Sequence, residues 1–239
     1  MKAVEHKVKH YYQPTNSSCG YASLAMLLSY YDFHITPKEV IKQVNVRNHG
    51  KESGDGSVTA QLAAWVVTQG YDVEFYSFDS QITDLSWSKL SQQEILEQLK
   101  KVKDVRDVKA LGGKEWSKLY VQAYIDLIKS GGILHVRPYV TTKLLYALLN
   151  KGPVYANIAS TTLRGKGRQR MVGLHKSITD DINGTTATHS IVIYGNDEKG
   201  NFLIADPWVG LVVIEPETIA VVITAAQIEC DNQVFVIER

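Results

Sequence analysis

The apolar positions near the start of the chain follow the spacing of a helix. Between residues 22 and 30 they recur every three or four residues, which predicts a buried helix whose first turn holds Cys19. Ser17 or Ser18 is a suitable N-cap for this helix, and no proline interrupts it. We therefore expect Cys19 to lie at the positive end of a buried helix.

Several other segments carry the signals of helix ends. Residues 36–39 and 91–94 each have a Ser or Thr three positions before a Glu, which is the pattern of a capping box. Glycines follow three further periodic segments, as is common where helices end. The predicted helices lie at about residues 37–44, 59–69, 91–101, 116–129 and 141–150.

Short apolar runs predict strands, mostly in the second half of the chain. Residues 189–195 and 201–206 are two such runs, and residues 196–200 between them fit a hairpin turn. Residues 218–226 fit either a helix or a strand. The other predicted strands lie at about residues 71–78, 133–139, 153–160, 211–214 and 234–237. Helices followed by an antiparallel sheet predict an α+β domain.

The segments between these elements are rich in charge and glycine. Residues 45–57 predict a loop, and residues 100–114 a solvated surface turn. No repeat or low-complexity linker marks a domain boundary. We therefore expect one domain over residues 1–239, with residues 79–140 as an elaboration or insertion.

The longest predicted connection follows the strand that ends near residue 160. It covers about two dozen residues, which is unusual in a compact domain unless the segment is a lid or a binding loop. Its first part, residues 164–176, carries the basic residues Arg164, Lys166, Arg168, Arg170 and Lys176. We favour a solvated, mobile loop over a contact with an acidic peptide, nucleic acid or another protein.

Composition narrows the choice of function. The 239 residues carry a net charge of +1, which argues against a general nucleic-acid binder. No run approaches the roughly 18 apolar residues of a membrane span, and the first residues lack the apolar core of a signal peptide. We therefore expect no membrane span and a cytoplasmic protein, with export by a non-classical route left open.

Metal and disulfide chemistry have little support. Cys19 and Cys230 are too few for a disulfide framework or a cysteine-rich zinc site, and we expect Cys230 to be a buried structural thiol. Six histidines have no spacing typical of a metal site: His6, His10, His34, His49, His135 and His175. We expect them to have surface or core roles, and we expect no metal and no organic cofactor.

Cys19 is the first candidate for chemistry. Free backbone N–H groups and the helix dipole favour an anion in the first turn, which lowers the pKa of a thiol there. The alternative is a small buried residue beside Gly20 and Ala22. A nucleophilic cysteine also needs a base, a group that orients the base, and donors for an oxyanion.

Three residues elsewhere can supply these groups. His189 begins the first arm of the predicted hairpin and Asp206 ends the second, so the two are expected to be neighbours across the strands. Gln13 precedes Cys19 by six positions, and its amide can fold back toward the thiol. A cysteine, a histidine and an orienting carboxylate form the arrangement that acyl transfer requires.

These motifs resemble those of the C39-like (double-glycine-type) peptidases, within the papain-like cysteine peptidase superfamily. The similar segments are YYQPTNSSCGYASLAMLL, GDGSVTAQLAAWV, LLNKGPVYANI and THSIVIYGNDEKGNFLIADPW. The resemblance implies Cys19 as nucleophile, His189 as general base and acid, Asp206 as its orienting group and Gln13 in the oxyanion hole. It also implies a papain-like fold, with a helical N-terminal half whose central nucleophile helix packs on a C-terminal antiparallel sheet.

We accordingly expect a cysteine peptidase that cleaves a peptide or amide bond of a peptide or protein substrate through an acyl-enzyme. Two alternatives remain at this stage. One is an acyltransferase or transpeptidase that uses the same triad, and the other is a non-catalytic peptide-binding module. The sequence does not indicate whether the protein is a monomer or an oligomer.

Overall fold

The computed structural model of the chain describes residues 2–44, 56–111, 113–173, 176–229 and 232–238. The predictions for residues 45–55, His175 and Cys230 fall outside these ranges.

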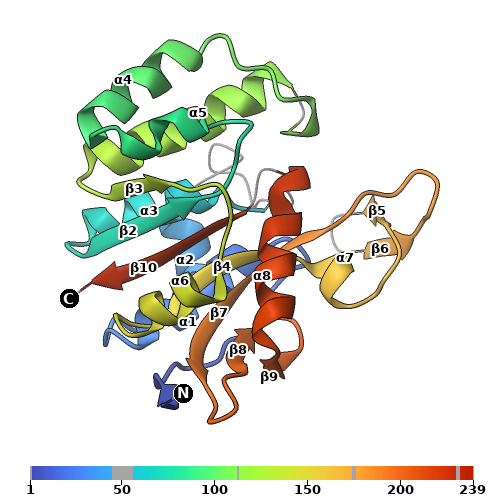
Figure 1. Cartoon of the computed structure of the whole chain (residues 1–239). Helices are drawn as coiled ribbons and strands as arrows, with labels where there is room; N and C mark the ends of the chain where they lie inside the picture. The colour runs from blue at the N-terminus through green and yellow to red at the C-terminus, as the bar shows by residue number, and fades with distance from the viewer. Residues whose placement is uncertain (1, 45–55, 112, 174–175, 230–231, 239) are drawn as a thin grey trace.

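One mixed sheet runs through the middle of the molecule (Figure 1). Its neighbouring strands, in order, are β3 (Ile133–Val136), β2 (Asp72–Ser77), β10 (Gln233–Glu238), β4 (Val154–Ala159), β7 (Thr188–Asn196), β8 (Phe202–Asp206) and β9 (Gly210–Ile214). The short strand β1 (Val4–Glu5) pairs with the end of β7. Two further strands, β5 (Gln169–Gly173) and β6 (Lys176–Thr179), form a separate hairpin.

Helices cover both faces of the main sheet. The α-helices are α1 (Cys19–Ser29), α2 (Pro37–Val44), α3 (Thr59–Thr68), α4 (Gln92–Val102), α5 (Lys114–Lys129), α6 (Thr142–Leu149), α7 (Ser160–Leu163) and α8 (Pro216–Ala225). Three 3₁₀ turns, η1 (Leu85–Lys89), η2 (Lys109–Leu111) and η3 (Ala226–Glu229), lie between them. Helices α1, α3 and α5 lie on one side of the sheet, whereas α6 and α8 lie on the other (Figure 1).

A separate apolar cluster fills the space on each side of the sheet. On the first side, Leu24 of α1 and Tyr124 of α5 belong to the same buried cluster as Phe75 of β2. On the second side, Leu145 of α6 and Ile219 of α8 belong to the other cluster. Because apolar side chains leave both faces of the sheet, its central strands are continuously hydrophobic rather than alternating.

The predicted helices are confirmed. At the start of α4, Ser91 and Glu94 form both bonds of the predicted capping box. At the start of α2, Thr36 accepts a hydrogen bond from the Glu39 N–H and donates one to its carboxylate. The ambiguous segment 218–226 is helical, as part of α8 and the start of η3.

Helix α1 is enclosed as its pattern predicted. Every residue from Gly20 to Leu28 is buried, as expected for a helix that is apolar on all sides. Ser18 occupies the N-cap position but makes no capping bond with its side chain. Its hydroxyl instead accepts the Thr15 N–H at 2.8 Å, which closes the turn that leads into Cys19.

The sheet differs from the prediction of a C-terminal antiparallel sheet. Strands β2, from the first third of the chain, and β3, from its middle, pair in parallel, while the last strand, β10, inserts between β2 and β4. A parallel pair needs a long crossover connection. Residues 78–132, with helices α4 and α5, form that crossover.

Residues 164–170 of the long connection after β4 are mostly exposed, as predicted for a solvated segment, but the connection is not an irregular loop. It contains α7 and the β5–β6 hairpin, and the backbones of Gln169 and Thr185 exchange two hydrogen bonds of 2.8 and 2.9 Å. This segment is ordered by hydrogen bonds between backbone groups that are far apart in the sequence. No local hydrophobic pattern predicts these bonds.

None of the helices in the described ranges has the length and apolar content needed to span a lipid bilayer. Within the same ranges, no group of three or more His, Cys, Asp or Glu side chains is placed to hold a metal ion.

Candidate active site

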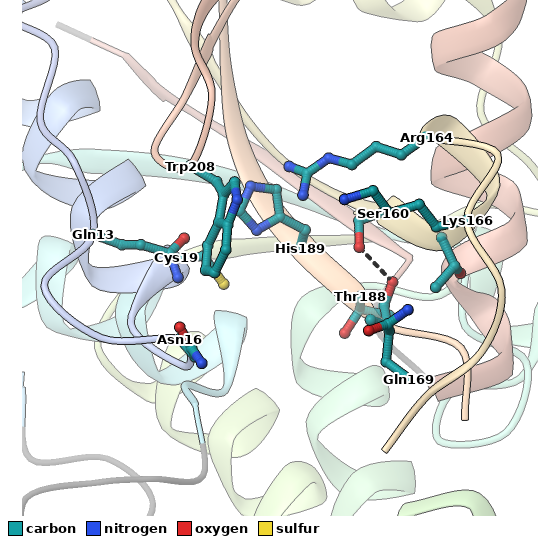
Figure 2. A pocket seen from close by; sticks show the side chains of 12 residues that line it. Gln13, Asn16, Cys19, Ser160, Arg164, Lys166, Gln169, Thr188, His189 and Trp208 are labelled. Carbon is teal, nitrogen blue, oxygen red and sulfur yellow. Dashed lines mark hydrogen bonds between the residues drawn. The ribbon is translucent and has the colours of Figure 1, made fainter. Parts of the chain in front are cut away.

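A pocket of about 180 Å³ lies where the N-terminus of α1 meets the start of β7 (Figure 2). Cys19, His189 and Gln13 line it, together with Trp208 from the segment after β8. Residues of α7 and β5 form the opposite wall. The pocket therefore collects side chains from both ends of the chain and from the long connection between β4 and β7.

Cys19 is the first residue of α1 and carries a half-buried free thiol. The next residue must be small, because a Cβ atom added to Gly20 would lie 2.0 Å from the Ser57 hydroxyl oxygen. Further along α1, the Ser23 hydroxyl donates to the Ser190 carbonyl at 2.9 Å. Helix α1 is thus attached to β7 one residue beyond His189, which holds the thiol beside the start of that strand.

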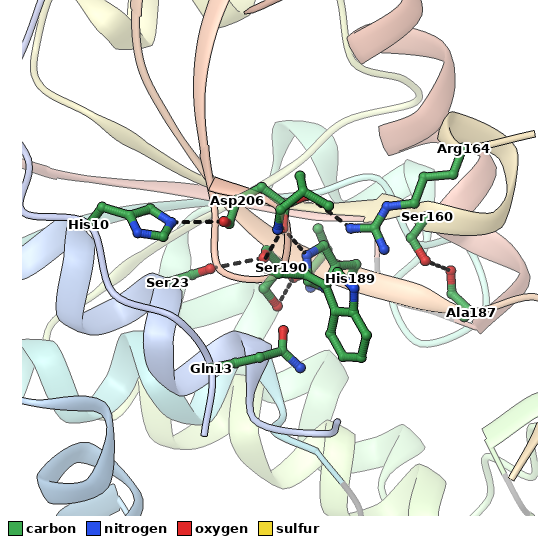
Figure 3. Close-up of polar contacts among 12 residues, drawn as sticks. His10, Gln13, Ser23, Ser160, Arg164, Ala187, His189, Ser190 and Asp206 are labelled. Atoms are coloured by element: carbon green, nitrogen blue, oxygen red, sulfur yellow. Dashed lines mark hydrogen bonds and ion pairs between the residues drawn. The ribbon is translucent and has the colours of Figure 1, made fainter. Parts of the chain in front are cut away.

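His189 and Asp206 are joined directly: the histidine Nε2 lies 2.8 Å from the carboxylate Oδ1 (Figure 3). Both residues are almost fully buried, at 7% and 2% exposure. The imidazole has one other nitrogen, Nδ1, and the ring also hydrogen-bonds the Cys19 thiol. The ring therefore bridges the sulfur and the carboxylate.

A β-bulge in the hairpin places Asp206 on the correct face. The register between β7 and β8 shifts around Tyr194. Without this shift, the pairing nearest the turn would place Asp206 opposite Val192, whose side chain leaves the other face of the sheet from His189. With the shift, Val192 pairs with Ala205, and continuing this register by one residue places Asp206 level with Ile191, diagonally adjacent to His189 and on the same face.

Asp206 accepts several hydrogen bonds besides that of His189. The backbone N–H of Trp208 donates to Oδ1 at 2.7 Å, and Arg164 Nη2 lies 3.0 Å from Oδ2. The Nε2 of His10 lies 2.9 Å from the Asp206 carbonyl oxygen. Arg164 and His10 were not expected at the site, since nothing in their local sequence relates them to Asp206.

These contacts shift the pKa values of all three groups. Burial alone would raise the pKa of the Cys19 thiol, but the hydrogen bond and charge of His189, with hydrogen bonds from Ser190, outweigh it and lower that pKa. Burial likewise disfavours a charged imidazole. The hydrogen bonds and charges of Asp206 and Cys19 nevertheless raise the pKa of His189 to about 9.

The carboxylate remains ionised for the same reasons. Burial would raise the pKa of Asp206, yet the hydrogen bond and charge of His189, the Trp208 N–H and the charge of Arg164 hold it well below its usual range. The site therefore favours a thiolate and an imidazolium side by side, with an ionised carboxylate behind the ring.

Gln13 lines the pocket on the other side of Cys19 from the α7 wall (Figure 2). Its backbone N–H donates to the Pro207 carbonyl at 2.9 Å, which connects this segment to the end of β8. Its side-chain Nε2 donates to the Thr15 carbonyl at 2.7 Å. The amide nitrogen carries a second N–H besides the one that binds Thr15.

A thiol, an imidazole and a carboxylate in this order form the arrangement used by acyl-transfer enzymes with a cysteine nucleophile. The chain belongs to the Peptidase_C39 like family, whose model matches residues 5–212. The matched range includes Gln13, Cys19, His189 and Asp206, and it ends before α8.

Two further comparisons complete this picture. A search of curated proteins finds no match. A crystal structure of a proposed C39-like peptidase from Bacillus anthracis aligns with 100% of this chain and 98% of its own, at 12% identity and a TM-score of 0.46.

Proposed function

We propose that the protein is a papain-like cysteine peptidase, with Cys19 as nucleophile, His189 as general base and acid, and Asp206 as the residue that orients His189. The observation that supports this most strongly is the continuous contact from the Cys19 thiol through the His189 ring to the Asp206 carboxylate, at the edge of a pocket. Membership of the C39-like peptidase family agrees with it.

In the first step, the Cys19 thiolate attacks the carbonyl carbon of the peptide bond. The negative charge moves to the carbonyl oxygen, where the backbone N–H of Cys19 and the second N–H of the Gln13 amide would stabilise it. The N–H of Cys19 belongs to the first turn of α1, where helix geometry leaves N–H groups without intrahelical partners. The helix dipole acts in the same direction.

Collapse of this intermediate breaks the carbon–nitrogen bond. The His189 imidazolium donates its Nδ1 proton to the departing amine, while Asp206 keeps the ring oriented through Nε2. The result is a thioester between the substrate acyl group and Cys19. A water molecule then attacks the thioester with neutral His189 as base, and this step releases the carboxylic acid and regenerates the thiol.

The direct test is the rate of Cys19 alkylation by iodoacetamide as a function of pH, followed by mass spectrometry of the Cys19 peptide. We expect wild type to titrate with an apparent pKa well below the roughly 8.5 of an ordinary thiol. His189→Ala removes the imidazolium and should lose that reactivity. His34→Ala changes an exposed histidine outside the pocket and should behave as wild type.

Two results would overturn the proposal. One is a wild-type thiol that titrates like an ordinary cysteine and is unaffected by His189→Ala. The other is a reactive thiol in a protein that hydrolyses no peptide in a broad peptide library, with Cys19→Ala binding those peptides as tightly as wild type. The second result would identify a peptide-binding module.

A further inference from the structure

The wall of the pocket opposite Gln13 carries two cations and no acidic side chain. Arg164 and Lys166 line the pocket, and no Asp or Glu does. The guanidinium of Arg164 and the amino group of Lys166 both turn toward the side where His189 lies (Figure 2). Arg164 already pairs with the buried Asp206, whereas the charge of Lys166 beside it is not balanced by any ion pair among the described residues, so the wall keeps an excess positive charge that favours a further anion.

The backbone from which both cationic side chains extend has a defined conformation. Helix α7 ends with Arg164 as its C-cap, followed by Gly165 at φ +57°. The Gly165 N–H donates to the Thr162 carbonyl at 3.3 Å, and the Lys166 N–H donates to the Thr161 carbonyl at 3.0 Å. These two bonds are those of a Schellman motif, which makes residues 164–166 a built helix end rather than a flexible loop.

A second contact attaches this helix to the catalytic strand. The Ser160 N–H and hydroxyl both bind the Ala187 carbonyl, at 2.8 and 3.0 Å (Figure 3). Ala187 lies two residues before His189, so these two bonds attach the start of α7 to the chain just before the catalytic histidine. The basic wall is therefore fixed relative to the ring that would protonate the leaving amine.

The two cationic side chains differ in their existing ion-pair partners. Arg164 uses Nη2 for Asp206, and its side chain is 22% exposed. A guanidinium has five N–H donors, so most of them remain for a ligand. Lys166 is exposed, and no ion pair involves it among the residues that the structure describes.

We infer that Arg164 and Lys166 form a carboxylate-binding subsite on the leaving-group side of the scissile bond, so that the preferred substrates are peptides with a carboxylate just C-terminal to the cleaved bond. This inference rests on the proposed peptidase function. The leaving group of the substrate must lie near His189, because His189 protonates the departing amine. The basic wall lies on the side of His189 away from Gln13, so it is close to the leaving group. Two sources supply such a carboxylate, an Asp or Glu side chain and the free C-terminus of a short peptide.

The first test uses a library of synthetic peptides, each made with a free and with an amidated C-terminus, and maps cleavage by mass spectrometry. We expect Asp or Glu to be enriched within about three positions after the cut if the side chain is bound. We expect cleavage close to the end of free but not amidated peptides if the terminus is bound. Cleavage with neither preference would overturn the inference and leave the peptidase function intact.

Charge reversal at Lys166 sharpens this test. Lys166→Glu should lower kcat/KM for an acidic peptide by roughly tenfold to a hundredfold, the range expected for losing a hydrogen bond to a charged group. It should raise kcat/KM for the same peptide with Lys in that position. Lys89→Glu makes the same charge change at an exposed residue that does not line the pocket, and should leave both values unchanged.

A second measurement needs no substrate. Iodoacetate and iodoacetamide alkylate the same thiol and differ by one negative charge, so the ratio of their rate constants reports the attraction of an anion to the pocket. We expect Lys166→Glu to lower this ratio several-fold at low salt, with Lys89→Glu unchanged. An equal ratio in all three proteins would overturn the inference. A Cys19 that reacts with neither reagent in wild type would instead overturn the proposed function.

Discussion

The two longest connections between neighbouring elements of the main sheet are built in opposite ways. The first, residues 78–132, joins β2 to β3, and its buried apolar residues include Ile95, Leu99 and Tyr120. The second, residues 160–187, joins β4 to β7 and has no fully buried large apolar side chain among those whose burial the structure describes. The first connection extends the core, while the second forms a wall of the active-site pocket.

This difference explains why the structure of one connection can be predicted from the sequence and that of the other cannot. A connection that packs through apolar side chains carries a repeating pattern, and that pattern can be recognised along the chain. A connection held by backbone hydrogen bonds and ion pairs has no such pattern. The Arg170–Asp180 pair at 2.6 Å and the Schellman motif at the end of α7 are of the second kind.

The largest effect on stability should come from the core of the first connection. Leu99 is 0% exposed, so Leu99→Ala should lower the free energy of unfolding by about 2–5 kcal/mol. Leu85→Ala makes the same change at a residue that is 50% exposed and should have little effect. Urea denaturation measures both. Equal losses in the two variants would show that this connection is not part of the core.

Arg164 should matter most in the second connection. Arg164→Ala leaves the buried Asp206 carboxylate without one of its partners and should cost about 1–3 kcal/mol of stability. Because the charge of Arg164 helps to lower the pKa of Asp206, its loss raises that pKa, and stability should be lost at a higher pH as the solution is acidified.

Arg170→Ala is the matched control for this prediction. Arg170 is 46% exposed, and its ion pair with Asp180 lies at the surface. Removing it should leave both the unfolding free energy and the acid limb of the stability curve nearly unchanged. If Arg164→Ala and Arg170→Ala have the same acid limb, the contact between Arg164 and Asp206 does not stabilise the carboxylate in solution.

The decrease in the rate of peptide hydrolysis at alkaline pH should depend on the pKa of His189 and not on either connection. The pKa of His189 is raised to about 9, so the imidazolium needed to protonate the leaving amine is lost as the pH rises through that value. The acylation rate should then fall about tenfold per pH unit above roughly pH 9. The single-turnover rate of acylation of Cys19 by a peptide substrate, measured as a function of pH, checks this prediction. Leu85→Ala should leave this decrease in place, and a decrease near pH 6.5 would show that the pair with Cys19 does not form.

The smallest effect should come from two glycines in similar positions. Gly70 follows α3 at φ +89°, Gly165 follows α7 at φ +57°, and a Cβ atom added to either meets nothing within 4 Å. Each change to Ala should therefore cost only about 1 kcal/mol, through backbone strain. Thermal unfolding checks this cost. Only Gly165→Ala should also alter the ratio of iodoacetate to iodoacetamide reactivity, because only Gly165 positions Lys166.

The chain by itself determined the local elements. Helices α1 to α6, the capping boxes of α2 and α4, and the hairpin of β7 and β8 follow from periodicity and turn residues, which depend on neighbours within about one helical turn. The same local signals predicted Cys19 at a helix start, and His189 and Asp206 at the ends of the hairpin. These predictions needed no knowledge of distant contacts.

Only the tertiary structure determined which of these elements pair with or pack against one another. The order of strands, with β10 between β2 and β4, depends on contacts between residues about 80 positions apart for β4 and more than 150 positions apart for β2. The bulge at Tyr194 selects the face on which Asp206 lies, and the turn after α7 brings Arg164 to that carboxylate from 42 residues away. Such contacts are energetically favourable only once both partners are already positioned by the fold, and for that reason no local pattern of residues encodes them.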